Sequence, residues 1–465
     1  MKNIKYSFTA LTLGLVLFSS CSKELFEEPL NSVSTNTAFS SPARIEKASI
    51  GMYNALQNAN WLNGRAQIYA DIRGIDASPA TYFGQMALFN TLQANDGTVG
   101  AAWQGAYRTI YEANLFLKNF APAASTVPQA KADQYVGEAK FIRSLSYFYL
   151  VNHFAQPYTF TADASHLGVP LVLDAADDPF SPTNNLARSS VKQVYDQMIA
   201  DLTDAEAKLP TTYPVAYDRV SRATKGAAQA LLMRIYLYKG DYANAVTYAN
   251  KIIGSGLYAY NASPVTAFRT FTTNESIFSI ANDGGDNPNT NNAIGQHYGS
   301  SRRADIPISS DFVSLYEPTD ERLELIENAS GAYWTTKYNA GTTDWVPIFR
   351  YTEVLLTKAE ALANLAPGTT VDPTALDLLN EVRARSSASP RVPTTKQELI
   401  DYILLERRLE LAFEGQGIFD FLRTKRGIPA HSVVAAQPYG SDYVILPIPK
   451  YDLDKNPNLV RNPGY

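Results

Sequence analysis

Apolar residues recur three and four positions apart in several long segments of the chain, and that spacing predicts amphipathic helices. Prolines follow most of these segments, at positions where a helix would end. The expected helices span Ile45–Leu56, Trp103–Phe120, Gln134–Phe154 and Val191–Leu209, and Pro122, Pro157 and Pro210 follow the last three. The chain is therefore expected to be built mainly from helices.

The segment Gly226–Ile253 has the pattern of two antiparallel helices joined by a tight turn. Gly240 can adopt the left-handed conformation that ends the first helix, and Asp241 can cap the second. Ala245 and Ala249 leave room for the two helices to approach closely, as in a tetratricopeptide repeat. Two generic amphipathic helices remain the alternative for any single pair of this kind.

A second helix pair is expected at Phe349–Ala366 and Thr374–Ser386. Its second helix starts with Asp372 as the cap and Pro373 in the first turn, where the missing N–H of proline has no helical partner to lose. The segment Leu399–Leu422 and the helix expected before Pro157 supply candidates for further pairs. Several pairs in one chain predict a repeat scaffold.

Two long stretches without helical periodicity, Gly64–Gly100 and Leu257–Val346, separate the helical blocks. A compact domain tolerates long irregular segments mainly where they carry function, so we expect the binding surface there. Exposed aromatic rings can stack on the C–H face of a sugar, while Asn, Asp and Arg side chains bond its hydroxyls. The candidate ligand-binding residues are Tyr82, Phe83, Tyr298, Trp334 and Trp345. For each of them, packing beneath its own loop is the alternative.

The N-terminus has the features of a bacterial lipoprotein signal. A basic start and an apolar run lead to Ser19 and Ser20, directly before Cys21, the only cysteine of the chain. Signal peptidase II requires small residues before a cysteine that carries a diacylglycerol, so lipid attachment is predicted at Cys21. The alternative is an ordinary secretory signal with an incidental cysteine. The expected organisation is a signal peptide over residues 1–20, a flexible tether over 21–41 and a single domain over 42–465.

Composition and charge narrow the function classes. Acylation of Cys21 leaves no thiol, so the exported chain must be stable without a disulfide, and 45% hydrophobic residues over 465 positions suffice for a large core. Removing residues 1–20 takes away two lysines and no acids, which changes the formal net charge from −5 to −7. Such an acidic chain is not expected to bind nucleic acid. The 29 tyrosines and 21 phenylalanines suit flat apolar surfaces that meet hydroxyl-rich ligands.

The sequence offers little evidence of metal binding or nucleophilic catalysis. The four histidines are isolated, without metal-ligand spacing, and no phosphate-binding loop or nucleophile elbow is present. The run Asp283–Asn289 is rich in oxygen ligands but lacks the EF-hand order, so no metal site is predicted and calcium is a minor alternative.

Three acids spaced four apart, Glu406, Glu410 and Glu414, would lie on one helical face. We interpret them as part of a structural ion network, because charges in a packed helical array need partners. The arginines expected to pair with them are Arg383, Arg385, Arg407, Arg408 and Arg423. A pair of glycosidase carboxylates remains open, since sequence spacing cannot exclude it.

A set of segments spread along nearly the whole chain after Cys21 carries a family resemblance. The segments are Gly51–Leu56, Trp103–Asn114, Gly137–Leu145, Gly168–Leu171, Gly226–Ile253, Leu379–Arg385, Glu406–Arg423, Leu446–Pro449, Asn456–Leu459 and Asn462–Tyr465. Together they resemble the SusD/RagB family, surface lipoproteins of Bacteroidetes that partner outer-membrane TonB-dependent transporters. Gly417 stands where the family usually has Arg, and Arg461 where it usually has Gln.

The resemblance implies an all-α, SusD-like fold with four tetratricopeptide-like units and with the irregular segments packed on one side as the ligand face. It also implies a lipid-anchored, non-enzymatic protein of the outer-membrane surface, which captures an oligosaccharide and closes as a lid on a SusC-like TonB-dependent transporter. No cofactor is implied, although calcium occurs in some relatives. The alternatives are a peptide-binding, RagB-like uptake lipoprotein, for which Arg302 and Arg303 leave room, and a surface glycoside hydrolase.

Overall fold

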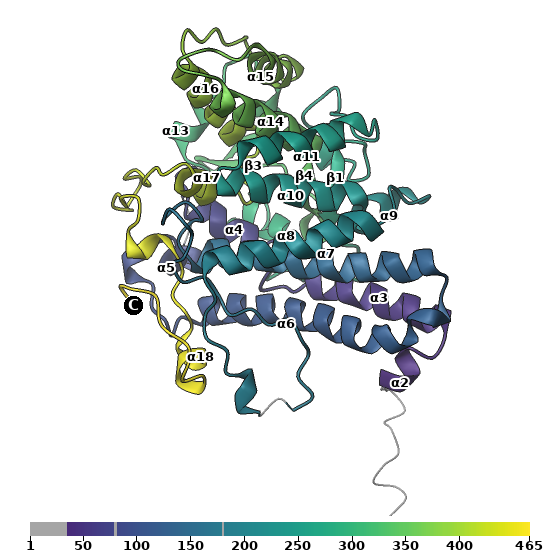
Figure 1. The fold of residues 1–465 in the computed structure, drawn as a ribbon. Helices are drawn as coiled ribbons and strands as arrows, with labels where there is room; N and C mark the ends of the chain where they lie inside the picture. Colours follow the sequence, from purple (N-terminus) through teal and green to yellow (C-terminus); the bar gives the residue numbers. More distant parts are fainter. Residues whose placement is uncertain (1–34, 79–80, 179–180) are drawn as a thin grey trace, which may run out of the picture.

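The computed structural model describes residues 35–78, 81–178 and 181–465, and most of them are helical (Figure 1). Helices account for 53% and strands for 6% of the structure, which confirms the expected all-α class. The predicted signal peptide and Cys21 lie outside the described residues.

Eight helices form the scaffold, each packed against its neighbours along the chain. They are α6 (Gly97–Phe120), α7 (Gln129–Phe154), α8 (Val191–Lys208), α10 (Lys225–Lys239), α11 (Tyr242–Gly254), α14 (Tyr351–Leu365), α15 (Pro373–Arg385) and α16 (Lys396–Glu410). α6 packs on α7, α7 on α8, α8 on α10, α10 on α11, α11 on α14, and α14 on both α15 and α16. The result is one continuous array of stacked helix pairs (Figure 1).

The two helix pairs predicted as repeats are confirmed, with their caps. Gly240 ends α10 with a φ of 73°, and the Asp241 side chain accepts a hydrogen bond from the backbone N of Asn244 (3.2 Å) at the start of α11. Asp372 accepts one from the backbone N of Ala375 (2.8 Å) at the start of α15. Local chemistry therefore fixed where these helices begin and end.

Small side chains sit where the helices approach one another. Ala245 and Ala249 of α11 are fully buried, as expected. Ala359 and Ala363 of α14 pack in a separate apolar cluster with Leu379 of α15, among other residues of α15 and α16. A side chain larger than alanine at these positions would force the helices apart.

The segment Leu399–Leu422 is divided between two helices, which corrects the prediction that Glu406, Glu410 and Glu414 share one helical face. α16 ends at Glu410, and α17 (Gly417–Arg423) starts after a turn in which Phe413 and Gly415 have positive φ. A Cβ at Gly415 would come within 3.0 Å of the Gln67 backbone, so this position also requires glycine for space. Glu414 therefore lies in the turn and not on the helical face of Glu406 and Glu410.

The two irregular stretches contain short elements and meet each other. The backbone N of Ser78 donates to Pro307 O (2.8 Å), and that of Ser309 donates to Asp76 O (2.9 Å). The elements within and beside them are α4 (Arg65–Ile72), α5 (Gly84–Ala87), α9 (Ala216–Ser221), α12 (Ile294–Tyr298), α13 (Ser310–Val313), and strands β1 (Ser276–Ile280), β2 (Ile326–Ala329), β3 (Ala332–Thr335) and β4 (Val346–Arg350). β1 pairs antiparallel with β4, and β2 with β3. The sequence did not reveal α4 because all eight of its residues are buried, so it has no polar face.

Residues 35–41, which the sequence assigns to the tether, include a short helix, α2 (Thr35–Ala38). The ring of Phe39 lies 5.6 Å from that of Phe116 on α6, so this segment contacts the scaffold. α3 (Pro42–Leu56) follows with proline in its first turn, and α18 (Lys450–Lys455) lies near the C-terminus.

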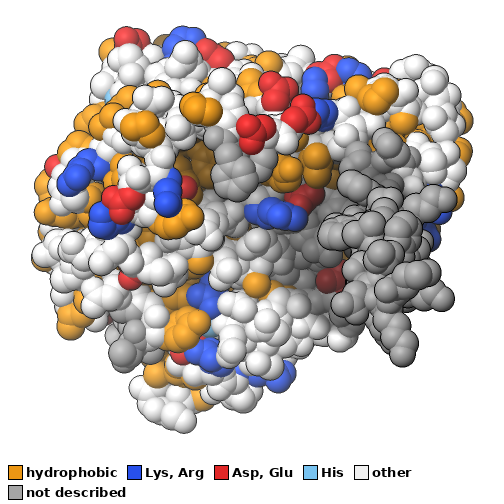
Figure 2. Space-filling view, turned by 90° about the horizontal axis from the view of Figure 1, so that it is seen from below, with side chains coloured by type: hydrophobic (Ala, Val, Ile, Leu, Met, Phe, Trp, Pro, Cys, Tyr) orange, Lys and Arg blue, Asp and Glu red, His pale blue; other side chains and the backbone are white. Residues whose placement is uncertain are grey.

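Within the described ranges, the structure has no helix that is both long and apolar enough to cross a membrane. On the face shown in Figure 2, Lys, Arg, Asp and Glu side chains are interspersed with hydrophobic and uncharged ones.

Candidate functional site

An exposed tyrosine marks the place where the two irregular stretches meet. Tyr82 is 50% exposed, although its ring also packs against the rings of Phe83 and His297. The Arg303 guanidinium lies 4.5 Å from the centre of its ring, and that of Arg65 lies 5.3 Å away. We call Arg65, Tyr82, Asn291, Asn292 and Arg303 the Tyr82 platform.

Hydrogen bonds hold the polar groups of the Tyr82 platform in place. Arg65 Nη2 donates to the Tyr82 hydroxyl (3.1 Å), to Asn291 O (2.8 Å) and to Asn292 Oδ1 (3.0 Å). Arg303 Nη1 donates to Asn291 Oδ1 (3.1 Å). An aromatic face flanked by fixed amide and guanidinium groups can stack on a sugar ring and bond its hydroxyls.

A buried layer of rings supports the platform. His297 is fully buried, 5.5 Å from the Tyr82 ring and 4.9 Å from the Phe83 ring, measured between ring centres. Its Nδ1 lies 2.7 Å from Asp305 Oδ2. Burial, aided by the charge of Arg65, lowers the pKa of His297 to about 4 against the opposing effect of Asp305. The imidazole is therefore neutral at physiological pH and supports the platform as a ring rather than as a charge.

The structure separates the five predicted ligand-binding residues. Tyr82 is exposed, while Phe83 lies beneath it. Tyr298 is fully buried, donates its hydroxyl to Asp71 Oδ2 (3.1 Å) and stacks on Tyr338. The structure thus brings Tyr82 and Phe83 together with the segment of Tyr298, but only Tyr82 offers a face to a ligand. Ligand contact itself remains a prediction.

The two tryptophans lie elsewhere, and each is only 8% exposed. Trp334 Nε1 donates to Ala329 O (3.2 Å) within the β2–β3 hairpin. Trp345 donates to Asn282 O (3.0 Å) and stacks on Phe271. We expected aromatic residues in polar loops to be exposed, and this expectation is wrong for these two tryptophans. Irregular segments also need buried apolar side chains on which to pack.

Three residues of the platform were missed by sequence reasoning: Arg65, Asn291 and Asn292. Arg65 begins α4, which has no amphipathic pattern, so no local signal marked it. The asparagines extend the polar run that starts at Asp283, and that composition was the available signal.

Comparisons with known proteins cover most of the chain. A family model described as "Starch-binding associating with outer membrane" matches residues 26–237, and one described as "SusD family" matches residues 326–465. The chain belongs to the SusD/RagB family.

Relatives and solved structures agree with this membership. SusD-like protein P2 of Formosa agariphila is 26% identical over the full length of both chains. The starch-binding protein SusD of Bacteroides thetaiotaomicron is 32% identical over 26% of this chain and 21% of its own length. A SusD superfamily structure from Bacteroides fragilis superposes with a TM-score of 0.81 at 28% identity, covering 91% of this chain and 99% of that one. A putative sugar binding protein from Bacteroides vulgatus has a TM-score of 0.79 at 25% identity over 91% and 99%.

In this SusD/RagB chain, the three acids of the predicted ion network are buried and paired, so their structural role is confirmed. Arg383 and Arg385 bind Glu406 and Glu410 (2.7 and 2.6 Å), as expected. The other expected arginines pair differently: Arg407 and Arg423 with Glu360 and Asp420, and Arg408 with Asp76. The missed partners come from the second irregular stretch and β4.

Those missed partners are Arg322, Lys337 and Arg350. Arg322 binds Glu406 (2.6 Å), and Lys337 and Arg350 each bind Glu414 at 2.7 Å. Burial alone would raise the pKa of Glu414, but Arg350 and Lys337 outweigh it and hold the pKa below its usual range. Such a carboxylate is a poor general acid, because it stays ionised.

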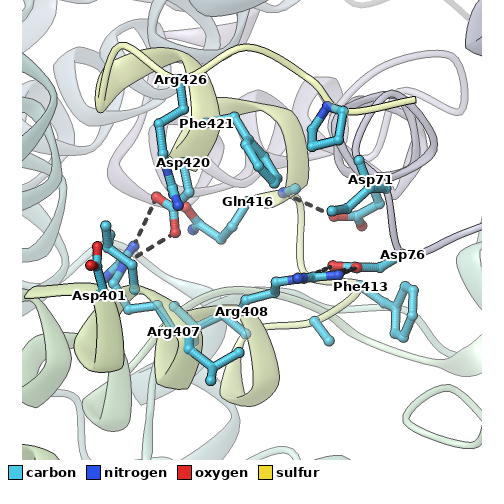
Figure 3. A pocket seen from close by; sticks show the side chains of 17 residues that line it. Asp71, Asp76, Asp401, Arg407, Arg408, Phe413, Gln416, Asp420, Phe421 and Arg426 are labelled. Carbon is cyan, nitrogen blue, oxygen red and sulfur yellow. Dashed lines mark hydrogen bonds and ion pairs between the residues drawn. The ribbon is translucent and has the colours of Figure 1, made fainter. Parts of the chain in front are cut away.

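A cavity of about 350 Å³ lies between α4, α16 and α17. In Figure 3, Arg408 lies against Asp76 and Arg407 against Asp420, at 2.9 and 3.1 Å. Asp71 accepts hydrogen bonds from Gly415 N and from the Tyr298 hydroxyl, and burial raises its pKa to about 7 despite them. The charges in this cavity largely neutralise one another.

Among the described residues, no group of three or more His, Cys, Asp or Glu side chains could hold a metal ion. The Asp283–Asn289 run folds on itself instead: Asp283 Oδ1 accepts hydrogen bonds from Gly285 N (2.7 Å) and Asp286 N (2.8 Å).

Proposed function

We propose that this SusD/RagB protein binds oligosaccharides at the cell surface and delivers them to a TonB-dependent outer-membrane transporter, on which it acts as a lid. The observation that carries the proposal is the Tyr82 platform, an exposed ring surrounded by oriented asparagine and arginine groups. Family members bear names such as starch-binding protein and putative sugar binding protein, which supports a saccharide ligand. Acylation at Cys21 would hold the protein at the outer membrane.

The protein is proposed to act without catalysis. A glycoside hydrolase needs two carboxyl groups across a cleft, one of them able to donate a proton. Glu406, Glu410 and Glu414 are buried and bound to cations, so none is available for that role. A peptide ligand is the second candidate, favoured only by the adjacent Arg302 and Arg303, which could bind a peptide carboxylate.

The test uses the soluble chain beginning at Ser22 and a panel of neutral and acidic oligosaccharides and peptides, with binding measured by calorimetry. Tyr82→Ala should lower the affinity for the tightest-binding saccharide at least tenfold, about 1.4 kcal/mol, because stacking on the ring is lost. The matched control is Tyr451→Ala on α18, where the native side chain is 64% exposed; its affinity should not change. Unchanged affinity in Tyr82→Ala would remove the platform from the binding site. Binding of peptides alone would favour the second candidate.

A further inference from the structure

Arginines in this protein are commonly neutralised by carboxylates, but several of those in the irregular stretches are not. Arg322 and Arg350 each bind at least two acids. By contrast, Arg65, Arg269 and Arg302 form no ion pair with any residue in the described part of the chain. An unneutralised guanidinium keeps its full capacity to bind an anion.

Arg269 and Arg302 line the same hollow, of about 330 Å³, and Arg302 directly precedes Arg303 of the Tyr82 platform in the chain. Hydroxyl and amide groups line it as well, from Ser301, Thr336 and Asn339. Glu327 on β2 is the one acid among its lining residues, so two guanidinium groups face one carboxylate. The hollow is therefore locally positive in a protein with a negative net charge.

The chain is shaped to hold Arg302 in this hollow. A tight turn links Arg302 N to Gly299 O (3.2 Å), and a Cβ added at Gly299 would lie 2.9 Å from Arg302 Cγ. Gly341 has a φ of 76°, and a Cβ there would lie 3.1 Å from Arg302 Cζ. Two glycines thus leave the room that the side chain occupies, yet its guanidinium makes no hydrogen bond to any described residue.

Backbone carbonyl groups hold Arg269 in place. It donates to Thr336 O (2.9 Å) and Phe268 O (3.2 Å). Burial lowers its pKa, and Asp344 opposes this only in part. Its charge therefore remains without a close counter-ion.

We propose that the hollow binds the acidic group of a saccharide, the carboxylate of a uronic acid or a sulfate ester, while a neighbouring ring of the same ligand stacks on Tyr82. This inference rests on the proposed function and names its substrate class. The planar fork of Arg302 matches the two oxygens of either anion, and no existing ion pair has to be broken. Arg302 and Arg303 are consecutive in the chain: Arg302 lines the hollow, and the Arg303 guanidinium lies 4.5 Å from the centre of the half-exposed Tyr82 ring.

The experiment compares matched ligands on the soluble chain beginning at Ser22. One arm uses tetragalacturonate and its full methyl ester, which differ in charge and not in linkage. The other uses a carrageenan tetrasaccharide and its desulfated form. The arms distinguish the carboxylate from the sulfate, and affinities are measured by calorimetry at low and moderate salt.

At least one acidic ligand should bind tenfold or more tightly than its neutral counterpart, with a preference that weakens as salt rises. Arg302→Gln should remove the preference, and Arg302→Lys should keep part of it, because lysine retains the charge but not the fork. Arg461→Gln is the matched control on an exposed arginine and should leave the preference intact.

Equal binding of the charged and neutral forms, or a preference that survives in Arg302→Gln, would overturn the inference. If only neutral glycans from the wider panel bind, the acidic ligand class is wrong and the proposed function stands. If no saccharide binds, or if only peptides bind, both the proposed function and the acidic-saccharide inference are wrong.

Discussion

Neutralising Glu410 should destabilise the whole domain, because three arginines depend on it. Glu410 is 3% exposed and accepts hydrogen bonds from Arg385 (2.6 Å), Arg350 (3.2 Å) and Arg322 (3.3 Å). Burial alone would raise its pKa, but these cations outweigh the effect and hold the pKa well below the usual range. Glu410→Gln keeps the shape of the side chain and removes only its charge.

The size of the effect follows from the partners left behind. Removing one member of a buried ion pair costs about 3–5 kcal/mol, since the remaining charge is desolvated without compensation. Glu414 and Glu275 still bind Arg350, and Glu406 still binds Arg322, so we expect the lower end, about 3 kcal/mol. For roughly 430 residues unfolding together, an entropy of about 0.9 kcal/mol/K converts this loss to a drop in Tm of about 3 °C.

Differential scanning calorimetry and urea unfolding of Glu410→Gln measure this loss. Glu324→Gln is the matched control, because that side chain is exposed and forms no ion pair with a described residue; its Tm should match the wild type. A Glu410→Gln variant that melts like the wild type would refute the reasoning. If it also lost a hydrolytic activity, the acid would be catalytic after all.

Three further predictions concern other parts of the chain. Trp334→Ala and Trp345→Ala should each lower the free energy of unfolding by about 3 kcal/mol or more, because both rings are buried. An unchanged midpoint in urea unfolding would contradict their role in the packing of the irregular segments. The raised pKa of Asp71, about 7, means that the folded chain binds this proton more tightly than the unfolded chain between about pH 4 and pH 7, so its contribution to stability falls as the pH rises through that window. The unfolding free energy of the wild type minus that of Asp71→Asn should therefore shrink from pH 5 to pH 8, and a constant difference would argue against the shift. Cys21→Ala should leave folding intact and release the protein from outer-membrane fractions of cells that lack the transporter partner, and retention there would exclude lipid anchoring.

The sequence by itself determined the helical scaffold. Periodic apolar positions, Gly240 in the left-handed conformation and the caps at Asp241 and Asp372 depend on neighbours within a few residues, so local physics sufficed to locate these elements. Because these signals are local, two features of the helices were not predicted correctly. α4 is buried all round and has no periodic face, and Glu414 lies in a turn that a regular spacing of acids could not reveal.

Only the tertiary structure decided which side chains face solvent in the irregular stretches and which charges meet. Tyr82 is exposed while Trp334 and Trp345 are buried, although all three stand in similar polar surroundings in the sequence. Arg65 meets Asn291 across 226 positions, and Arg322 meets Glu410 across 88. Burial and ion pairing in segments without periodicity depend on packing against distant parts of the chain, and no local pattern encodes that packing.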